Sequence, residues 1–267
     1  LLISVLSIML ALVAACVAEG LLRLIYLITN LCYHHVASAE FGGPQPWFGT
    51  PLHSDLGLLV VVVPVVGGLI VGLMARYGSE GIRGHGIPEA MHQVLARGSR
   101  VPARLTFLKP LSAAIAIGTG GPFGAEGPII ATGGALGSVI GQLITTTAAE
   151  RKTLLAAGAA AGMAATFGAP VSATLLAIEL LLFEFRPRSF IPVALASTTA
   201  AGMRFVFDQP YPIFAMPELH HVAEPSLLIY ILIGALVGVA SVFVTRAVYA
   251  IEDAFSLLPI HWMWWPA

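Results

Sequence analysis

The sequence GAEGP, residues 124–128, interrupts a long run of apolar residues that is otherwise typical of membrane-spanning helices. Two similar interruptions, rich in glycine and ending in proline, are GHGIP at residues 84–88 and, more weakly, FGAP at residues 167–170. Proline is favoured in the first turn of a helix, where its missing N–H would have no partner. The glycines before it can adopt backbone angles that other residues avoid. We therefore predict that each interruption begins a helix inside apolar sequence.

The composition indicates an all-α polytopic membrane protein. Of the 267 residues, 57% are hydrophobic and 10% charged, and the mean hydropathy is +0.89. Soluble domains carry about 25% charged residues, so the polar surface is too small to cover a globule in water. A net charge of −1 offers no basic field for nucleic acid. The two cysteines have neither metal-ligand nor disulfide-scaffold spacing, and we expect no metal and no cofactor.

Apolar stretches predict the helices. Residues 1–33 and 56–75 are each long enough to span a hydrocarbon core, which needs about 20 residues. Further apolar stretches lie at about 105–122, 128–148, 153–167, 170–185, 189–206 and 226–250, and several are too short to span alone. Residues 41–55 are expected to form a loop. Residues 76–104 carry five arginines against two glutamates, which predicts a cytoplasmic connection.

Glycines repeat every four residues within several of these stretches, for example at Gly133, Gly137 and Gly141, and again at Gly158 and Gly162. This spacing places the glycines on one face of a helix, where two backbones can approach closely in a membrane. We predict that these residues pack helices together and have no chemical role.

A helix start exposes unpaired N–H groups and the positive end of the helix dipole. Directed into a membrane, such starts can form an anion site without a buried full charge. Glu126 is the only charged residue between Lys109 and the cluster at residues 150–152. An intramembrane carboxylate is by default functional. When ionised, Glu126 can occupy the anion site, and when protonated it can move away. The alternative is a carboxylate that caps its own helix.

These motifs resemble those of the CLC family of chloride channels and proton-coupled chloride transporters. Residues 84–89 match the family's first anion motif, Gly-Ser-Gly-Ile-Pro, and residues 124–128 match its second, Gly-Arg-Glu-Gly-Pro. Residues 158–162 with 169–170 match the next helix pair. Lys109, seventeen residues before Glu126, falls where the family keeps a buried lysine. The matches occur in order over about residues 55–200.

The resemblance implies chloride transport gated by Glu126, as a channel or an H+/Cl− antiporter in a bacterial inner membrane. Lys109 is implied to add positive potential, and a structural salt bridge is its alternative. The resemblance also implies a homodimer, with helices at about 170–205 in the contact. The implied anion-binding residues are His85, Gly86, Ile87, Pro88, Gly124, Ala125, Gly127 and Pro128.

Two departures from the family motifs concern the anion site. His85 replaces a serine that donates to the anion. The imidazole can donate instead, can attract anions when protonated, or can point aside, so fluoride or nitrate is an alternative to chloride. Ala125 replaces an arginine, which we expect to alter packing more than mechanism.

A third departure concerns protons. Leu180 stands at the family's proton-relay position, while Glu179 matches the acid before it. Glu184, one turn further, can substitute for the relay or can cap the helix near Arg186 and Arg188. These residues leave open whether protons are exchanged.

The resemblance divides the chain into a first inverted repeat at about residues 1–206 and the start of a second at 226–267. The second repeat's anion motif, Gly-x-Phe-x-Pro, does not occur in this sequence. We therefore expect residues 1–267 alone to transport nothing. A remote alternative is an intramembrane hydrolase, but LGSV at residues 136–139 lacks the last glycine of a Gly-x-Ser-Gly nucleophile motif. EAMH at residues 89–92 is only part of a zinc-protease motif.

Overall fold

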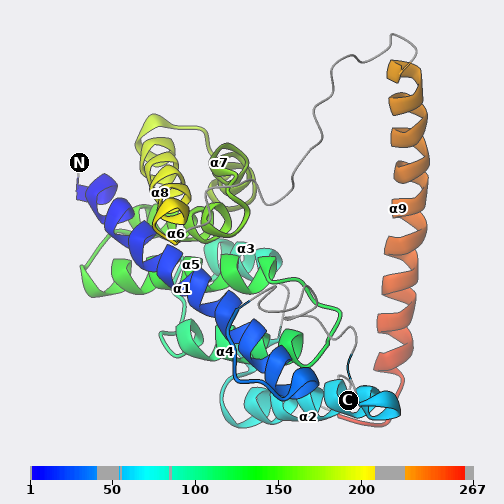
Figure 1. Ribbon diagram of the computed structural model, residues 1–267. Helices are drawn as coiled ribbons and strands as arrows, with labels where there is room; N and C mark the ends of the chain where they lie inside the picture. The colour runs from blue at the N-terminus through cyan, green and yellow to red at the C-terminus, as the bar shows by residue number, and fades with distance from the viewer. Residues whose placement is uncertain (1, 41–53, 55, 84–85, 208–225, 262–267) are drawn as a thin grey trace. The chain divides into compact units, whose positions relative to one another are not determined.

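The computed structural model describes residues 2–40, 54, 56–83, 86–207 and 226–261, and every regular element within these ranges is a helix (Figure 1). The chain divides into two compact units, Leu1–Ile213 together with residues 266–267, and Phe214–Trp265. The all-α prediction is confirmed. The predicted loop at residues 41–55 lies almost wholly outside the described residues.

The described residues of the first unit form eight α-helices, and seven of them follow the predicted apolar stretches closely. The eighth, α3, lies inside the charged connection and begins after the motif at residues 84–88, as predicted. A 3-10 turn at Gly57–Val61 leads into α2, and a π-turn at Ile178–Leu182 extends α7. The helices are α1 Leu2–His34, α2 Val62–Tyr77, α3 Ile87–Ala96, α4 Leu105–Gly118, α5 Glu126–Leu143, α6 Ala148–Phe167, α7 Pro170–Ala177 and α8 Pro187–Val206.

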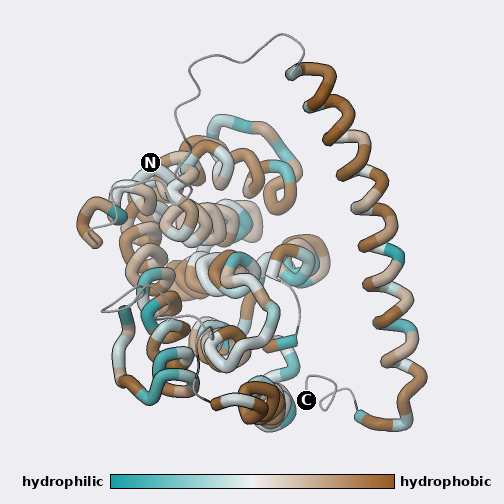
Figure 2. The backbone as a smooth tube through the Cα atoms, turned by 45° about the vertical axis from the view of Figure 1, so that its right-hand side comes forward, coloured by the Kyte–Doolittle hydropathy of each residue, from teal (hydrophilic) through white to brown (hydrophobic). Residues whose placement is uncertain are grey.

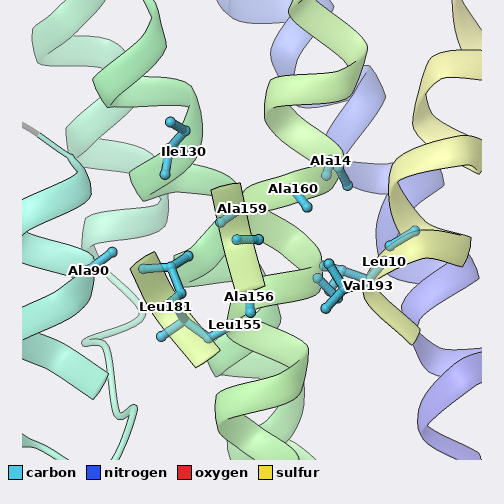
Figure 3. Close-up of a cluster of buried hydrophobic side chains, with 14 of the residues drawn as sticks. Leu10, Ala14, Ala90, Ile130, Leu155, Ala156, Ala159, Ala160, Leu181 and Val193 are labelled. Carbon is cyan, nitrogen blue, oxygen red and sulfur yellow. The ribbon is translucent and has the colours of Figure 1, made fainter. Parts of the chain in front are cut away.

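Helix α6 is the centre of this unit and packs against α1, α5, α7 and α8. Its alanines and Leu155 fill the middle of the buried cluster, with Leu10 of α1, Ile130 of α5 and Val193 of α8 around them (Figure 3). A Cβ atom on Gly133 would collide with the carbonyl of Gly158. The predicted glycine packing is therefore confirmed between α5 and α6, where small residues let the backbones touch.

Side-chain hydrogen bonds tie the connection between α3 and α4 to the rest of the unit. The Ser138 hydroxyl on α5 donates to the Ser99 carbonyl at 2.6 Å and accepts from the Val101 N–H at 2.9 Å. Arg151 on α6 donates to the Gly98 carbonyl through Nε at 3.0 Å and Nη2 at 2.9 Å. These bonds hold the C-terminal end of α3 against α5 and α6.

Many large apolar side chains are exposed on the surface of the unit. On α1, Leu10 and Ala14 are buried, whereas Leu2, Val5 and Met9 are exposed. Apolar residues on both faces of a helix suit contact with protein on one side and lipid on the other. By length and composition, four described helices can cross a membrane: α1, the 57–77 segment, α8 and α9.

Helix α9, Ser226–Ser256, belongs to the second unit. It is hydrophobic along most of its 31 residues (Figure 2). It is longer than the roughly 20 residues that a hydrocarbon core requires. Its start at Ser226 coincides with the predicted apolar stretch at 226–250.

Candidate anion-binding site

Helix α3 begins directly after Gly86, as the glycine–proline motif predicts. Gly86 is buried and has φ of +80°, a backbone angle that favours glycine, and Pro88 lies in the first turn. The first backbone bond of α3 runs from the Ala90 N–H to the Gly86 carbonyl at 2.9 Å. The N–H groups of Ile87 and Glu89 lie before that bond and lack partners within the helix. Gly84 and His85 lie outside the described residues.

Helix α5 begins at Glu126, with Ala125 as its N-cap and Pro128 in its first turn. The Ile129 N–H donates to the Ala125 carbonyl at 3.0 Å, so the N–H groups of Glu126 and Gly127 precede the first helical bond. The Ala125 side chain packs against an apolar cluster that α1 and α4 share with α5. At the third interruption, α7 begins at Pro170. The prediction of three helix starts is confirmed.

The starts of α3 and α5 are in direct contact. A Cβ atom on Gly86 would lie 2.5 Å from the Cα of Gly127 and would collide with its carbonyl. Only a glycine at residue 86 therefore allows the two backbones to meet. The first-turn N–H groups of two helices are brought to one place, although 40 residues separate Gly86 from Gly127 along the chain.

A cleft of about 580 Å³ lies beside this contact. Its lining comes from α2, the 82–83 segment, α4, the turn before α5 and the first turn of α5. Gly124, Glu126, Gly127 and Pro128 line it, whereas Ile87 and Pro88 are outside its described lining. The charged residues in the lining are Arg83, Lys109 and Glu126.

The Glu126 carboxylate faces this cleft and is exposed. It folds back over Gly124, where a Cβ atom would collide with the Oε2 atom. Within the described residues it makes no hydrogen bond or ion pair, so it does not cap its own helix by hydrogen bonding. An acidic side chain at a helix start is stabilised by the dipole, and this one has room to leave.

Lys109 is part of the cleft lining, but the residue is only 5% exposed. Its ammonium group donates to the Ile82 carbonyl at 2.8 Å, to the Gly81 carbonyl at 3.4 Å and to the Glu89 carboxylate at 2.8 Å. The structural salt bridge that the sequence left as an alternative is therefore present. It fastens α4 both to the first turn of α3 and to the segment that precedes α3.

A family model described as voltage gated chloride channel matches residues 66–267. The chain belongs to this family. Chloride channel protein CLC-e of Arabidopsis thaliana is 27% identical over 262 residues, which cover 93% of this chain and 36% of that protein.

Two solved CLC-type structures resemble the chain in fold. A slow cyanobacterial Cl−/H+ antiporter has a TM-score of 0.81 and 22% identity, over 99% of this chain and 60% of that one. A CLC-type fluoride/proton antiporter has a TM-score of 0.67 and 18% identity, over 89% of this chain and 55% of that one. The chain thus has the CLC fold and spans between about a third and three-fifths of the length of these three relatives.

In this CLC chain the two candidate proton-relay carboxylates differ in environment. Glu179 is exposed in the π-turn after α7. Glu184 accepts a hydrogen bond from the Ser189 hydroxyl at 2.8 Å and lies 3.5 Å from the Arg186 guanidinium. The Ser189 hydrogen bond, helped by the charges of Lys152, Arg186 and Arg188, lowers the pKa of Glu184. Glu184 is therefore bound at the start of α8 and favours its ionised form.

Sequence reasoning did not single out Glu89 or Arg83. Glu89 directly follows the Gly-His-Gly-Ile-Pro motif, and it is the ion-pair partner of Lys109. Arg83 directly precedes that motif and lines the cleft. The only sequence signal of Arg83 was its position next to the motif in a basic connection. Glu89 appeared at the end of the 84–89 motif match and in the partial zinc-protease motif, without a role as a partner of Lys109.

Proposed function

We propose that the protein carries small inorganic anions, chloride first, across a cell membrane along the cleft beside Gly86 and Gly127. The observation that carries the proposal is the direct contact of the α3 and α5 starts next to the Glu126 carboxylate. Backbone N–H groups at both starts replace part of the anion's hydration shell. They do so with partial charges fixed in the backbone, without placing an unpaired cation in the pathway.

Glu126 is the proposed gate. Its carboxylate carries the charge of an anion and sits at a helix start, so in the ionised state it competes with chloride for the same N–H groups. Protonation removes that competition and frees the side chain to swing away. The absence of hydrogen-bond partners for Glu126 among the described residues supports this, because little holds the carboxylate in place.

The proposed proton route, if the protein is an antiporter, leads to Glu126 from Glu179 or Glu184. Glu179 is the better candidate of the two, because Ser189 and Arg186 stabilise the ionised form of Glu184. The names of the similar proteins include a channel and two proton antiporters. The proposal therefore includes both passive anion conduction and anion–proton exchange. We further propose a homodimer in a bacterial inner membrane.

The hydrolase alternative has no exposed nucleophile at its candidate serine. Ser138 is fully buried, and its hydroxyl both donates to the Ser99 carbonyl and accepts from the Val101 N–H. A hydroxyl with these two partners fixes the α3–α4 connection to α5.

The test is anion efflux from liposomes that contain the complete natural polypeptide carrying this sequence. We expect chloride efflux to rise as pH falls, because the protonated gate no longer competes with chloride for the N–H groups. We expect Glu126→Gln to conduct without that pH response, because glutamine is a permanent mimic of the protonated acid. A pH response that survives in Glu126→Gln would show that another group is the gate. Parallel assays with nitrate and fluoride establish selectivity, and proton uptake driven by a chloride gradient separates an antiporter from a channel.

A further inference from the structure

Four exposed arginines, Arg76, Arg97, Arg100 and Arg104, form a basic surface where α2 and α3 end and α4 begins. The Arg104 guanidinium donates to the Gly78 carbonyl at 3.4 Å, which connects the start of α4 to the end of α2. The other two arginines lie within seven residues before Arg104. None of the four forms an ion pair with a described residue. Their charges are therefore open to a partner outside the described chain.

The two arginines between α3 and α4 flank a short segment whose backbone is held from inside the unit. The Ser99 carbonyl accepts from the Ser138 hydroxyl at 2.6 Å, and Ser99 is 1% exposed. The Gly98 carbonyl accepts from the Arg151 guanidinium at 3.0 and 2.9 Å. None of these bonds uses the side chain of either flanking arginine. The fold thus fixes where these two guanidinium groups emerge without using them as supports.

Large apolar side chains are exposed close to the arginines. On α2, Leu73 is 43% exposed and lies three residues before Arg76. On α4, Phe107 is 77% exposed and lies three residues after Arg104. Residues three apart share a helix face, and α2 packs against α4. Near the end of α3, Leu95 is 70% exposed. Guanidinium groups within about one turn of exposed apolar side chains suit the boundary between lipid headgroups and hydrocarbon.

Acidic residues near the basic surface are few. Within the described part of residues 76–104 they are Glu80, which is exposed, and Glu89, which forms an ion pair with Lys109. Glu150, at the start of α6, accepts hydrogen bonds from Thr147, and two cations follow it directly in the chain. One exposed carboxylate therefore stands against the four arginines, and the surface carries a net positive charge.

We propose that the basic surface binds the headgroups of anionic phospholipids, with the exposed apolar side chains in the adjoining hydrocarbon. The 57–77 segment, which can cross a membrane by length and composition, ends beside Arg76. This places the arginines where a spanning helix leaves the bilayer. Guanidinium groups match phosphate oxygens in pairs, and anionic leaflets attract arginines near the surface, each one strengthening binding by about fivefold. The proposal does not depend on which solute the protein carries.

The experiment measures the apparent melting temperature of the complete natural polypeptide in detergent as phosphatidylglycerol is added, with phosphatidylcholine as the neutral comparison. A lipid that binds the folded protein raises this temperature. We expect Arg97→Gln/Arg100→Gln to need about 25-fold more phosphatidylglycerol for half of the rise, because two arginines are lost. The matched control, Arg97→Lys/Arg100→Lys, keeps both charges and should keep most of the response. Inorganic phosphate should produce no comparable rise, because it has no acyl chains.

Three results would overturn the inference: an equal response of the parent to both lipids, a glutamine variant that responds to phosphatidylglycerol as the parent does, or a lysine variant that responds as weakly as the glutamine variant. An equal rise with inorganic phosphate would also overturn it. A purely structural role lowers the melting temperature equally in both lipids. If the glutamine variant does not fold, the parent and the lysine variant decide at low and high salt. Their preference for phosphatidylglycerol should weaken in high salt, and an unchanged preference would contradict the proposal.

Discussion

Replacing Gly86 by alanine tests whether the contact between the starts of α3 and α5 holds the site together. The new Cβ would lie 2.5 Å from the Gly127 Cα and would collide with the Gly127 carbonyl. Ordinary van der Waals contact for a Cβ begins at 3.4 Å, so the two helix starts must separate by about 1 Å. Both neighbours are backbone atoms, and neither can rotate out of the way.

Two costs add in Gly86→Ala. Forcing a non-glycine residue into the positive-φ conformation of residue 86 costs roughly 1–3 kcal/mol. Overpacking an already close contact costs about another 1–3 kcal/mol. The sum, roughly 2–6 kcal/mol, is a large part of the 5–15 kcal/mol by which proteins are typically stable. The same separation would remove the α3 N–H groups from the anion, so transport should fall as well.

The assay is the apparent melting temperature of the purified protein together with chloride efflux from liposomes. Gly20→Ala is the matched control. Gly20 is an exposed glycine in α1 where an added Cβ atom would have nothing within 4 Å, and alanine is the better helix former by about 1 kcal/mol. We expect Gly86→Ala to melt lower and to transport less, while Gly20→Ala melts no lower than the parent. If Gly86→Ala kept both parent stability and parent efflux, the two starts would not be in contact.

Two further predictions concern buried polar groups on α3 and α4. Lys109→Met should lower stability by about 3–5 kcal/mol, because it leaves the half-buried Glu89 carboxylate without its cation. In a double-mutant cycle of melting temperatures, the Lys109→Met/Glu89→Met double variant should recover most of that loss. Fully additive effects of the two substitutions would contradict this prediction. Gln93→Met should raise stability by about 1–3 kcal/mol, because Gln93 is 6% exposed and its Oε1 atom has no hydrogen-bond partner among the described residues. A lower melting temperature for Gln93→Met would show that this oxygen is bonded.

The helices and their starts followed from local signals. Glycine and proline restrict the backbone within a few residues, so α3, α5 and α7 could be placed from their motifs alone. The π-turn at Ile178–Leu182 could not be placed, because an apolar run has the same composition whichever helical bond pattern it adopts. The π-turn ends at Phe183, which has φ of +53°. Positive φ is usually predicted from a glycine, so a phenylalanine at this position gave no sequence signal.

The partners across the site could not be derived from sequence, because they depend on tertiary contacts. Nothing near Lys109 in the chain indicates Glu89, which lies twenty residues earlier, as its ion-pair partner. The family resemblance identified Lys109 as a buried lysine, but it did not decide whether Lys109 adds positive potential for the anion or forms a structural salt bridge. Arg83 was visible only as one of five arginines in a basic connection, and its place in the cleft emerges only when α2, α4 and α5 are assembled.

Two glycine contacts in this molecule show that close approach of two helix backbones does not by itself form an anion site, and that the helices must also begin at the contact. Gly133 and Gly158 bring α5 and α6 together in mid-helix, where every N–H already donates within its own helix. That contact is purely structural. Gly86 and Gly127 bring α3 and α5 together at their first turns, where the N–H groups are not yet used. The same residue type in the same kind of contact thus packs helices in one place and, in the other, brings together N–H donors that have no partner within their own helices.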